Sequence, residues 1–253
     1  MMQPVRSALL AIGIVASLGT TAHTLDPERE ARWRAEVVPG IVVGEAVDIP
    51  GPGDRPFLGL LTEPPGVDRA ATPLLVLVHG IGVHPDHGVI GTLRMDLADK
   101  GYATLSIQMP VLASDAPAEH YEPLFGNAAE RIGSAAAWAR GRGYRDLVLV
   151  SHSLGSRMSN AYFDRVSPPA YRAWVALGLP GSYTVKFAQT PSVPVLDIHG
   201  ERDIRPVLDN AAARARVARA SGATQQKIAG TDHFYASREA EVSNLIAEFA
   251  RRK

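Results

Sequence analysis

The chain has 253 residues, of which 46% are hydrophobic, and this is enough apolar material for a substantial core within one domain. Basic and acidic residues number 26 each, so no excess of positive charge favours nucleic acid or an anionic membrane as the main partner. The chain contains no cysteine, which excludes disulfides, thiol nucleophiles and lipid attachment through cysteine.

Residues 1–22 have the pattern of a secretory signal peptide. Arg6 precedes an uncharged run from Ser7 to Thr21, and Thr20-Thr21-Ala22 supplies small residues for cleavage. The run is shorter than the about 20 predominantly apolar residues that a membrane span needs, so a cleaved signal is favoured over a retained anchor. We therefore expect an exported protein, periplasmic or secreted, without stable membrane insertion after cleavage.

Residues 23–40 are expected to form an N-terminal arm, and residues 41–253 a single domain. Two short strands are predicted at Ile41–Ile49 and Pro56–Thr62, because a segment rich in proline and glycine, Pro50–Asp54, separates two apolar runs. The domain therefore begins with a small strand pair.

Strands and helices alternate through the rest of the chain. We expect strands at 74–79, 103–108, 146–151, 172–177, 194–199 and 223–229, and helices at 89–100, 126–140, 154–166, 207–220 and 237–251. This alternation predicts an α/β fold with a mostly parallel central sheet of about eight strands and helices on both faces. Gly178–Val193 is too short for a helical cap domain, so only loops 110–124 and 178–193 are expected to roof the carboxyl edge of the sheet.

Ser151-His152-Ser153-Leu154-Gly155 lies where an apolar strand ends and a helical pattern begins. A sharp turn at this point would raise the Ser153 hydroxyl above the sheet, and the small residues on either side let strand and helix pass closely. Ser151 stands where glycine is commoner, and we interpret it as a small variant. A serine still needs a base and a group that orients the base before it can act as a nucleophile.

Candidates for both groups lie downstream. Asp203 follows the strand at 194–199 within Gly200-Glu201-Arg202-Asp203, and His233 follows the last strand within Gly230-Thr231-Asp232-His233. Asp197 and Asp232 are alternative acids. Asp197 lies inside a strand, where a structural role is favoured, and Asp232 adjoins the histidine and would point elsewhere in an extended segment.

Together with His79-Gly80-Ile81-Gly82 after an earlier strand, these motifs resemble the α/β-hydrolase superfamily of serine hydrolases and esterases, and the likeness spans roughly residues 40 to 250. The stretch from His79 to Asp86, with Val195-Leu196-Asp197 later, is also similar to a poorly characterised branch of exported bacterial α/β-hydrolases.

The resemblance implies a role for each of these residues. Ser153 would be the nucleophile, His233 the general base and then acid, and Asp203 the residue that orients the imidazole. The oxyanion would be bound by the backbone N–H groups of Leu154 and Ile81, with Gly82 as the alternative donor.

Residues near these motifs are candidates for substrate contact, namely Gly82, His84, His152 and Tyr183, together with His120, Tyr121 and Phe187 in the two roof loops. His84, Asp86 and His87 also invite a metal interpretation, but no further ligand is identifiable, so loop structure or substrate contact is favoured. Trp138 and Trp174 are expected in the core. We expect no metal and no organic cofactor.

The functional hypothesis is a serine hydrolase that cleaves a carboxylic ester, of a small molecule or a polymer end, through an acyl-enzyme. Thioesters, lactones or amides would use the same groups, and an acyltransferase would differ only in the acceptor. The competing class is a non-catalytic binding protein of the cell envelope with the same fold. The sequence leaves the acyl length and the oligomeric state open.

Overall fold

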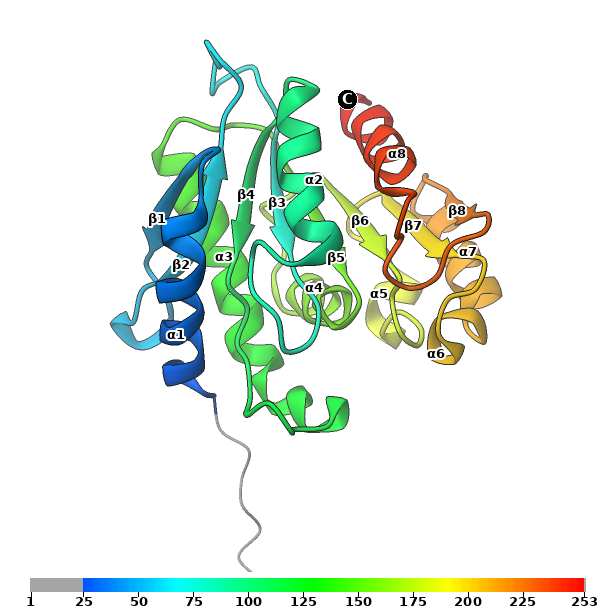
Figure 1. The fold of residues 1–253 in the computed structure, drawn as a ribbon. Coiled ribbons are helices and arrows are strands. Elements are labelled where there is room, and N and C mark those ends of the chain that lie inside the picture. The colour runs from blue at the N-terminus through cyan, green and yellow to red at the C-terminus, as the bar shows by residue number, and fades with distance from the viewer. Residues whose placement is uncertain (1–24, 253) are drawn as a thin grey trace, which may run out of the picture.

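The computed structural model describes residues 25–252, and the predicted signal segment lies outside this range. Eight strands form one sheet in the order β1-β2-β4-β3-β5-β6-β7-β8 (Figure 1). Their bounds are Glu45–Ile49 (β1), Phe57–Thr62 (β2), Leu74–Val78 (β3), Ala103–Ile107 (β4), Leu147–His152 (β5), Ala173–Leu177 (β6), Val195–Gly200 (β7) and Gln225–Ile228 (β8). From β4 to β8 every neighbouring pair is parallel, and β2 runs antiparallel to both β1 and β4. The predicted fold class is confirmed.

The central strands are apolar throughout because both of their faces are covered. Along β3, Leu74, Val76 and Val78 belong to one core cluster, whereas Leu75 and Leu77 belong to the other. This alternation is the two-residue period of a strand. Each face of the sheet therefore has its own hydrophobic core.

Two pairs of long helices form most of these two layers (Figure 1). Helices α2 (Gly88–Asp99) and α8 (Glu239–Arg251) supply the core that contains Leu75, and α3 (Phe125–Gly141) and α4 (Leu154–Arg165) supply the core that contains Leu74. The remaining helical segments are α1 (Pro27–Val37), α5 (Val185–Gln189), α6 (Arg205–Leu208), α7 (Ala211–Ala220) and the 3-10 turns η1 (Val38–Gly40), η2 (Pro52–Asp54) and η3 (Ala118–Leu124). Residues 178–194 thus hold only the five-residue helix α5.

The helix predicted at 207–220 is divided into α6 and α7. Asn210 lies at the break, and its side-chain amide donates a hydrogen bond of 3.1 Å to the Pro206 carbonyl. Asparagine side chains compete with the backbone in this way, and they weaken a helix interior. The short helix α6 therefore ends at Leu208, and it begins two residues after Asp203.

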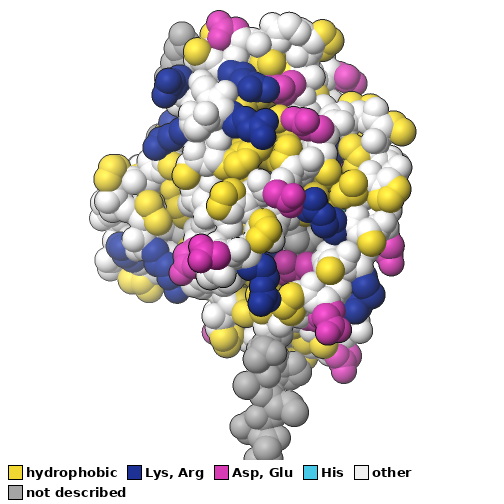
Figure 2. Space-filling view, turned by 90° about the vertical axis from the view of Figure 1, so that its left-hand side faces the viewer, with side chains coloured by type: hydrophobic (Ala, Val, Ile, Leu, Met, Phe, Trp, Pro, Cys, Tyr) yellow, Lys and Arg dark blue, Asp and Glu magenta, His cyan; other side chains and the backbone are white. Residues whose placement is uncertain are grey.

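The N-terminal arm contains a helix that the sequence analysis does not predict. Asp26 caps α1 by accepting a hydrogen bond of 2.9 Å from the Arg29 N–H, and Pro27 occupies the first helical position. Glu30 on α1 forms an ion pair of 3.1 Å with the buried Arg131 of α3, which docks the helix on the domain. On the face that carries α1 and β1, basic and acidic side chains are both spread over the surface (Figure 2).

No helix within residues 25–252 combines the length and the apolar character that crossing a membrane requires.

Candidate active site

Ser153 occupies a strained turn between β5 and α4. Its backbone has φ 55° and ψ −126°, in the left-handed half of conformational space, where residues other than glycine are uncommon. The start of α4 passes close to the end of β3, since a Cβ on Gly155 would lie only 2.3 Å from the His79 carbonyl oxygen. Glycine is therefore required at this position. Ser151 is buried, and its hydroxyl oxygen accepts a hydrogen bond of 2.8 Å from the Trp174 indole. A serine at this position therefore forms a side-chain hydrogen bond to Trp174 that glycine cannot form.

The structure brings Ser153, His233 and Asp203 into one chain of hydrogen bonds. The distance from Ser153 Oγ to His233 Nε2 is 2.8 Å, and that from His233 Nδ1 to Asp203 Oδ1 is 2.6 Å. With Nδ1–H donating to the carboxylate, the neutral imidazole presents Nε2 as an acceptor to the serine hydroxyl. This geometry lets His233 remove the serine proton.

Asp203 is held by backbone groups of its own loop. Its Oδ2 accepts from the Gly200 N–H at 3.1 Å, and its Oδ1 accepts from the Ile204 N–H at 2.8 Å. Burial opposes ionisation of Asp203, but the hydrogen bond and charge of His233 and these two N–H groups outweigh it and hold the pKa of the carboxyl below its usual range. Asp203 is therefore an anion at neutral pH.

His152 and Gly178 fix the His233 loop from two sides, and no motif in the sequence points to this role. Burial lowers the pKa of His152 to about 4, with His233 adding to the shift, so the ring is neutral and its Nε2–H donates to the His233 carbonyl at 2.9 Å. Gly178 has φ +53°, and a Cβ there would lie 2.9 Å from His233 Nδ1. Only glycine lets the end of β6 approach the imidazole this closely.

The loop after β3 lies against the nucleophile. A Cβ on Gly80 would lie 3.2 Å from the Ser153 Cβ, which places the adjoining Ile81 peptide beside the serine. Burial lowers the pKa of His79 to about 3, and the neutral ring donates from Nδ1 to the Gly80 carbonyl at 2.8 Å while Nε2 accepts from the Met109 N–H at 2.9 Å. His79 thereby orients the peptide that carries the Ile81 N–H.

Leu154 is the first residue of α4, so its N–H has no acceptor within the helix and points out of the helix start. Its position next to Ser153 gives the second backbone donor at the site.

A cavity of about 230 Å³ opens at Ser153 and His233. Its walls are mostly apolar and come from the segment after β3, the start of α2, the turn at β5 and the two loops that carry Asp203 and His233. They are formed by Gly80, Ile81, Val83, His87, Gly88, Val89, Ile90, His152, Ser153, Ile204, His233 and Phe234. These residues include no lysine, arginine, aspartate or glutamate.

The predicted roof loops lie elsewhere, because no residue of 110–124 or 178–193 lines this cavity. Tyr183 is 5% exposed and packs against Trp174 and Phe187 in the core, and Tyr121 is also buried. These aromatic side chains are buried in the core of the protein and do not line the cavity.

Gly82 and His84 also lie outside the cavity lining, whereas His152 belongs to it. The His84 ring packs edge-on against Trp33 of α1, Asp86 forms an ion pair of 2.9 Å with Arg94, and His87 faces the cavity. Within residues 25–252, no group of three or more His, Cys, Asp or Glu side chains could hold a metal ion.

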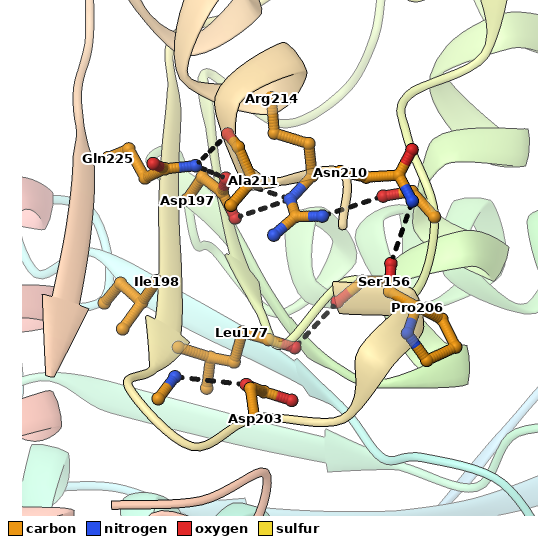
Figure 3. Close-up of polar contacts among 12 residues, drawn as sticks. Ser156, Leu177, Asp197, Ile198, Asp203, Pro206, Asn210, Ala211, Arg214 and Gln225 are labelled. Carbon is orange, nitrogen blue, oxygen red and sulfur yellow. Dashed lines mark hydrogen bonds and ion pairs between the residues drawn. The ribbon is translucent and has the colours of Figure 1, made fainter. Parts of the chain in front are cut away.

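The alternative acids do not contact His233 as Asp203 does. Asp197 is fully buried, forms an ion pair of 3.0 Å with Arg214 and accepts from the Gln225 amide at 2.6 Å (Figure 3). Asp232 is exposed, and its carboxylate accepts from the Phe234 N–H at 2.9 Å.

The Asp197 network supports the loop that carries Asp203. Arg214 also donates from Nη1 to the Gly181 carbonyl at 2.8 Å, and the Gly181 N–H donates to the Pro206 carbonyl at 2.8 Å. Pro206 belongs to α6, immediately after Asp203. Removing one partner of this buried ion pair would strand a charge in the core, so we expect the connection to the loop after Asp203 to be costly to break.

Comparison with known proteins identifies the fold but not the sequence family. Neither a protein-family model nor a curated protein matches the sequence. Among solved structures, Est1E from Butyrivibrio proteoclasticus is similar with a TM-score of 0.65 at 17% identity, over 81% of this chain and 96% of that one.

Two further solved structures extend this likeness. The esterase RhEst1 from Rhodococcus sp. has a TM-score of 0.64 at 14% identity over 82% of this chain and 98% of its own, and a dienelactone hydrolase from Anabaena variabilis has 0.61 at 20% over 80% and 94%. The sheet order, the turn at Ser153 and these likenesses show that the chain has the α/β-hydrolase fold.

Proposed function

We propose that the protein is a serine hydrolase that cleaves carboxylic esters through an acyl-enzyme. The observation that carries this proposal is the hydrogen-bonded chain Ser153, His233 and Asp203, with distances of 2.8 and 2.6 Å, at the mouth of an apolar cavity. Structures with a similar fold include proteins named as esterases and dienelactone hydrolases, which supports ester hydrolysis.

In the first half of the reaction, Ser153 Oγ bonds to the ester carbonyl carbon while its proton passes to His233 Nε2. The carbonyl oxygen becomes an oxyanion, which the N–H groups of Ile81 and Leu154 stabilise. The tetrahedral species then expels the alcohol, which takes the proton from His233 Nε2 and leaves the acyl group on Ser153.

In the second half, His233 takes a proton from water, and the hydroxide oxygen bonds to the acyl carbon. Collapse of this second tetrahedral species releases the carboxylic acid and returns the proton to Ser153 Oγ. Asp203 stabilises the imidazolium in both halves because its carboxylate stays ionised. The cycle uses no metal and no organic cofactor.

The test is labelling of the folded protein with a fluorophosphonate while turnover of p-nitrophenyl butyrate is followed. We expect the label on Ser153, located by peptide mass spectrometry, and a loss of turnover in proportion to the labelled fraction. A folded protein that takes no label would contradict the proposal and favour the binding-protein hypothesis. Hydrolysis that is slower than transfer to an added alcohol would favour an acyltransferase.

The cavity supports an uncharged substrate with an apolar acyl group. Its lining contains no lysine, arginine, aspartate or glutamate, and Val83, Val89 and Ile90 line it together. A buried methylene contributes about 0.8 kcal/mol, which is about four-fold in kcat/KM where the contact forms in the transition state.

We expect kcat/KM to rise by up to about four-fold per methylene from acetate toward longer p-nitrophenyl esters, and then to fall once the 230 Å³ cavity is full. Ile90→Ala enlarges the cavity and should move the optimum to longer chains. Leu93→Ala is the matched control, since Leu93 is fully buried on the same helix but does not line the cavity. A preference for an acyl group that bears a carboxylate would contradict this substrate class.

A further inference from the structure

Helix α1 of the N-terminal arm reaches the loop that carries the Ile81 N–H. The Arg29 guanidinium donates from Nη2 to the Gly82 carbonyl at 2.9 Å and from Nη1 to the Leu112 carbonyl at 2.6 Å. One side chain therefore joins the loop after β3 to the loop after β4. Both are charge-assisted hydrogen bonds, which are stronger than neutral ones.

Gly82 is the residue directly after Ile81, and its φ of +64° gives the chain a sharp change of direction there. On the other side of Ile81, the Gly80 carbonyl accepts from His79. The Gly80 carbonyl belongs to the same peptide as the Ile81 N–H and is bound by the neighbouring His79, whereas the Gly82 carbonyl lies two peptides further along and is bound by Arg29 of α1. The His79 bond therefore orients the Ile81 N–H directly, and the Arg29 bond holds the next part of the same loop in place.

Arg29 itself is held rigidly. Its guanidinium stacks 4.5 Å from the centre of the Trp33 ring, and the Asp26 N–H donates to the Val111 carbonyl at 2.8 Å, beside Leu112. The ion pair between Glu30 and the buried Arg131 anchors the same helix turn. A rigid support of this kind transmits its position to the loop that it binds.

We propose that Arg29 is a positioning residue for the oxyanion site, acting through the Gly82 carbonyl. The inference rests on the proposed function, because it assigns the Ile81 N–H as an oxyanion donor. Helix α1 would then influence the oxyanion site through Arg29, although α1 contributes no residue to the cavity wall.

The size of the effect is bounded by the donor that Arg29 positions. Loss of one oxyanion donor costs about 10²- to 10³-fold in kcat, and a displaced donor keeps part of that interaction. We therefore expect Arg29→Met to lower kcat for p-nitrophenyl butyrate by about ten-fold, with KM close to that of the wild type, because the acyl cavity is untouched. Arg29→Lys should recover part of the loss, since an ammonium group can still bind one of the two carbonyls.

An alkyl trifluoromethyl ketone gives a readout that general loss of stability does not move. Ser153 Oγ adds to its carbonyl carbon, the serine proton passes to His233, and the resulting oxyanion occupies the same site as in catalysis. If Arg29 positions the oxyanion donor, the inhibition constant of Arg29→Met should rise by the same factor by which its kcat/KM falls. Both quantities are measured at a temperature below the midpoint of thermal unfolding of each variant.

Arg34→Met is the matched control. Arg34 lies on the same helix, is 40% exposed and pairs with Asp48 on the surface, so its loss should leave kcat and inhibition unchanged. Wild-type kcat and inhibition in Arg29→Met would overturn the inference while the labelling of Ser153 still stands. Absence of labelling in the wild type would instead remove the proposed function itself.

Discussion

Replacing Ser153 with alanine is expected to lower kcat for p-nitrophenyl butyrate by about 10⁶-fold. In serine proteases of known mechanism, loss of the nucleophile alone costs about this much, because His233 and Asp203 would have no hydroxyl to activate. The residual rate would come from the oxyanion donors and the cavity, which hold the substrate for direct attack by water. The measurement is steady-state turnover at high enzyme concentration, corrected for the uncatalysed rate.

The fold should survive this substitution, because Ser153 Oγ is bonded only to His233 among the described contacts and the imidazole faces the cavity. Ser159→Ala is the control. Ser159 is a fully buried serine of α4, the helix that begins next to Ser153, and its hydroxyl has no hydrogen-bond partner within the described part of the chain. Its loss should leave kcat near the wild-type value. Wild-type turnover in Ser153→Ala would assign the chemistry to another nucleophile.

The fold and the positions of the three central residues were predictable because their signals are local. Ser153, Asp203 and His233 lie one, three and five residues after the ends of β5, β7 and β8, and parallel strands bring their carboxyl ends to one edge of the sheet. Residues that follow different strands, far apart in the sequence, are therefore close together in space. The fold is confirmed by the sheet and by the similar solved structures.

The cavity walls were not predictable, because the length of a loop does not fix its direction. The loop at 178–193 turns inward, where Tyr183 and Phe187 pack against Trp174. The walls come instead from short segments next to the motifs, including Ile204 and Phe234, which directly follow Asp203 and His233. The presence of a polar residue close to a motif in the sequence did not predict whether its side chain lines the cavity.

Helix α1 was missed for a different reason. None of its residues is buried, so it shows no apolar stripe, and it is held by ion pairs and by side-chain bonds to carbonyls. The capping residue Asp26, Pro27 in the first turn and the acidic Glu28 and Glu30 were the available signals. They indicate a helix but give no information on where it docks.

Asp203→Asn is expected to lower kcat by about 10⁴-fold at neutral pH, the loss that follows when the oriented carboxylate of such a triad becomes an amide. The Asp203 carboxylate accepts from three donors, the His233 ring at 2.6 Å and the N–H groups of Ile204 and Gly200 at 2.8 and 3.1 Å. An amide has one oxygen, so its NH₂ group must face a donor in either orientation.

If the NH₂ group of the Asp203→Asn variant faces Gly200, the imidazole keeps its tautomer but loses the negative charge that stabilises its protonated form. If the NH₂ group faces His233, the imidazole must accept at Nδ1, so Nε2 carries the proton and cannot take one from Ser153. Each arrangement disables the base, and labelling by the fluorophosphonate should slow together with turnover. Both rates are measured on the same preparation.

Asp232→Asn is the matched control, since it makes the same chemical change one residue from His233. Asp232 is exposed and its carboxylate accepts from the Phe234 N–H, a bond that an asparagine oxygen can accept equally well. Its kcat should stay near the wild-type value. A large loss in Asp232→Asn with full activity in Asp203→Asn would transfer the orienting role to Asp232, whereas equal losses in both would show that the loop, and not one carboxylate, holds the imidazole.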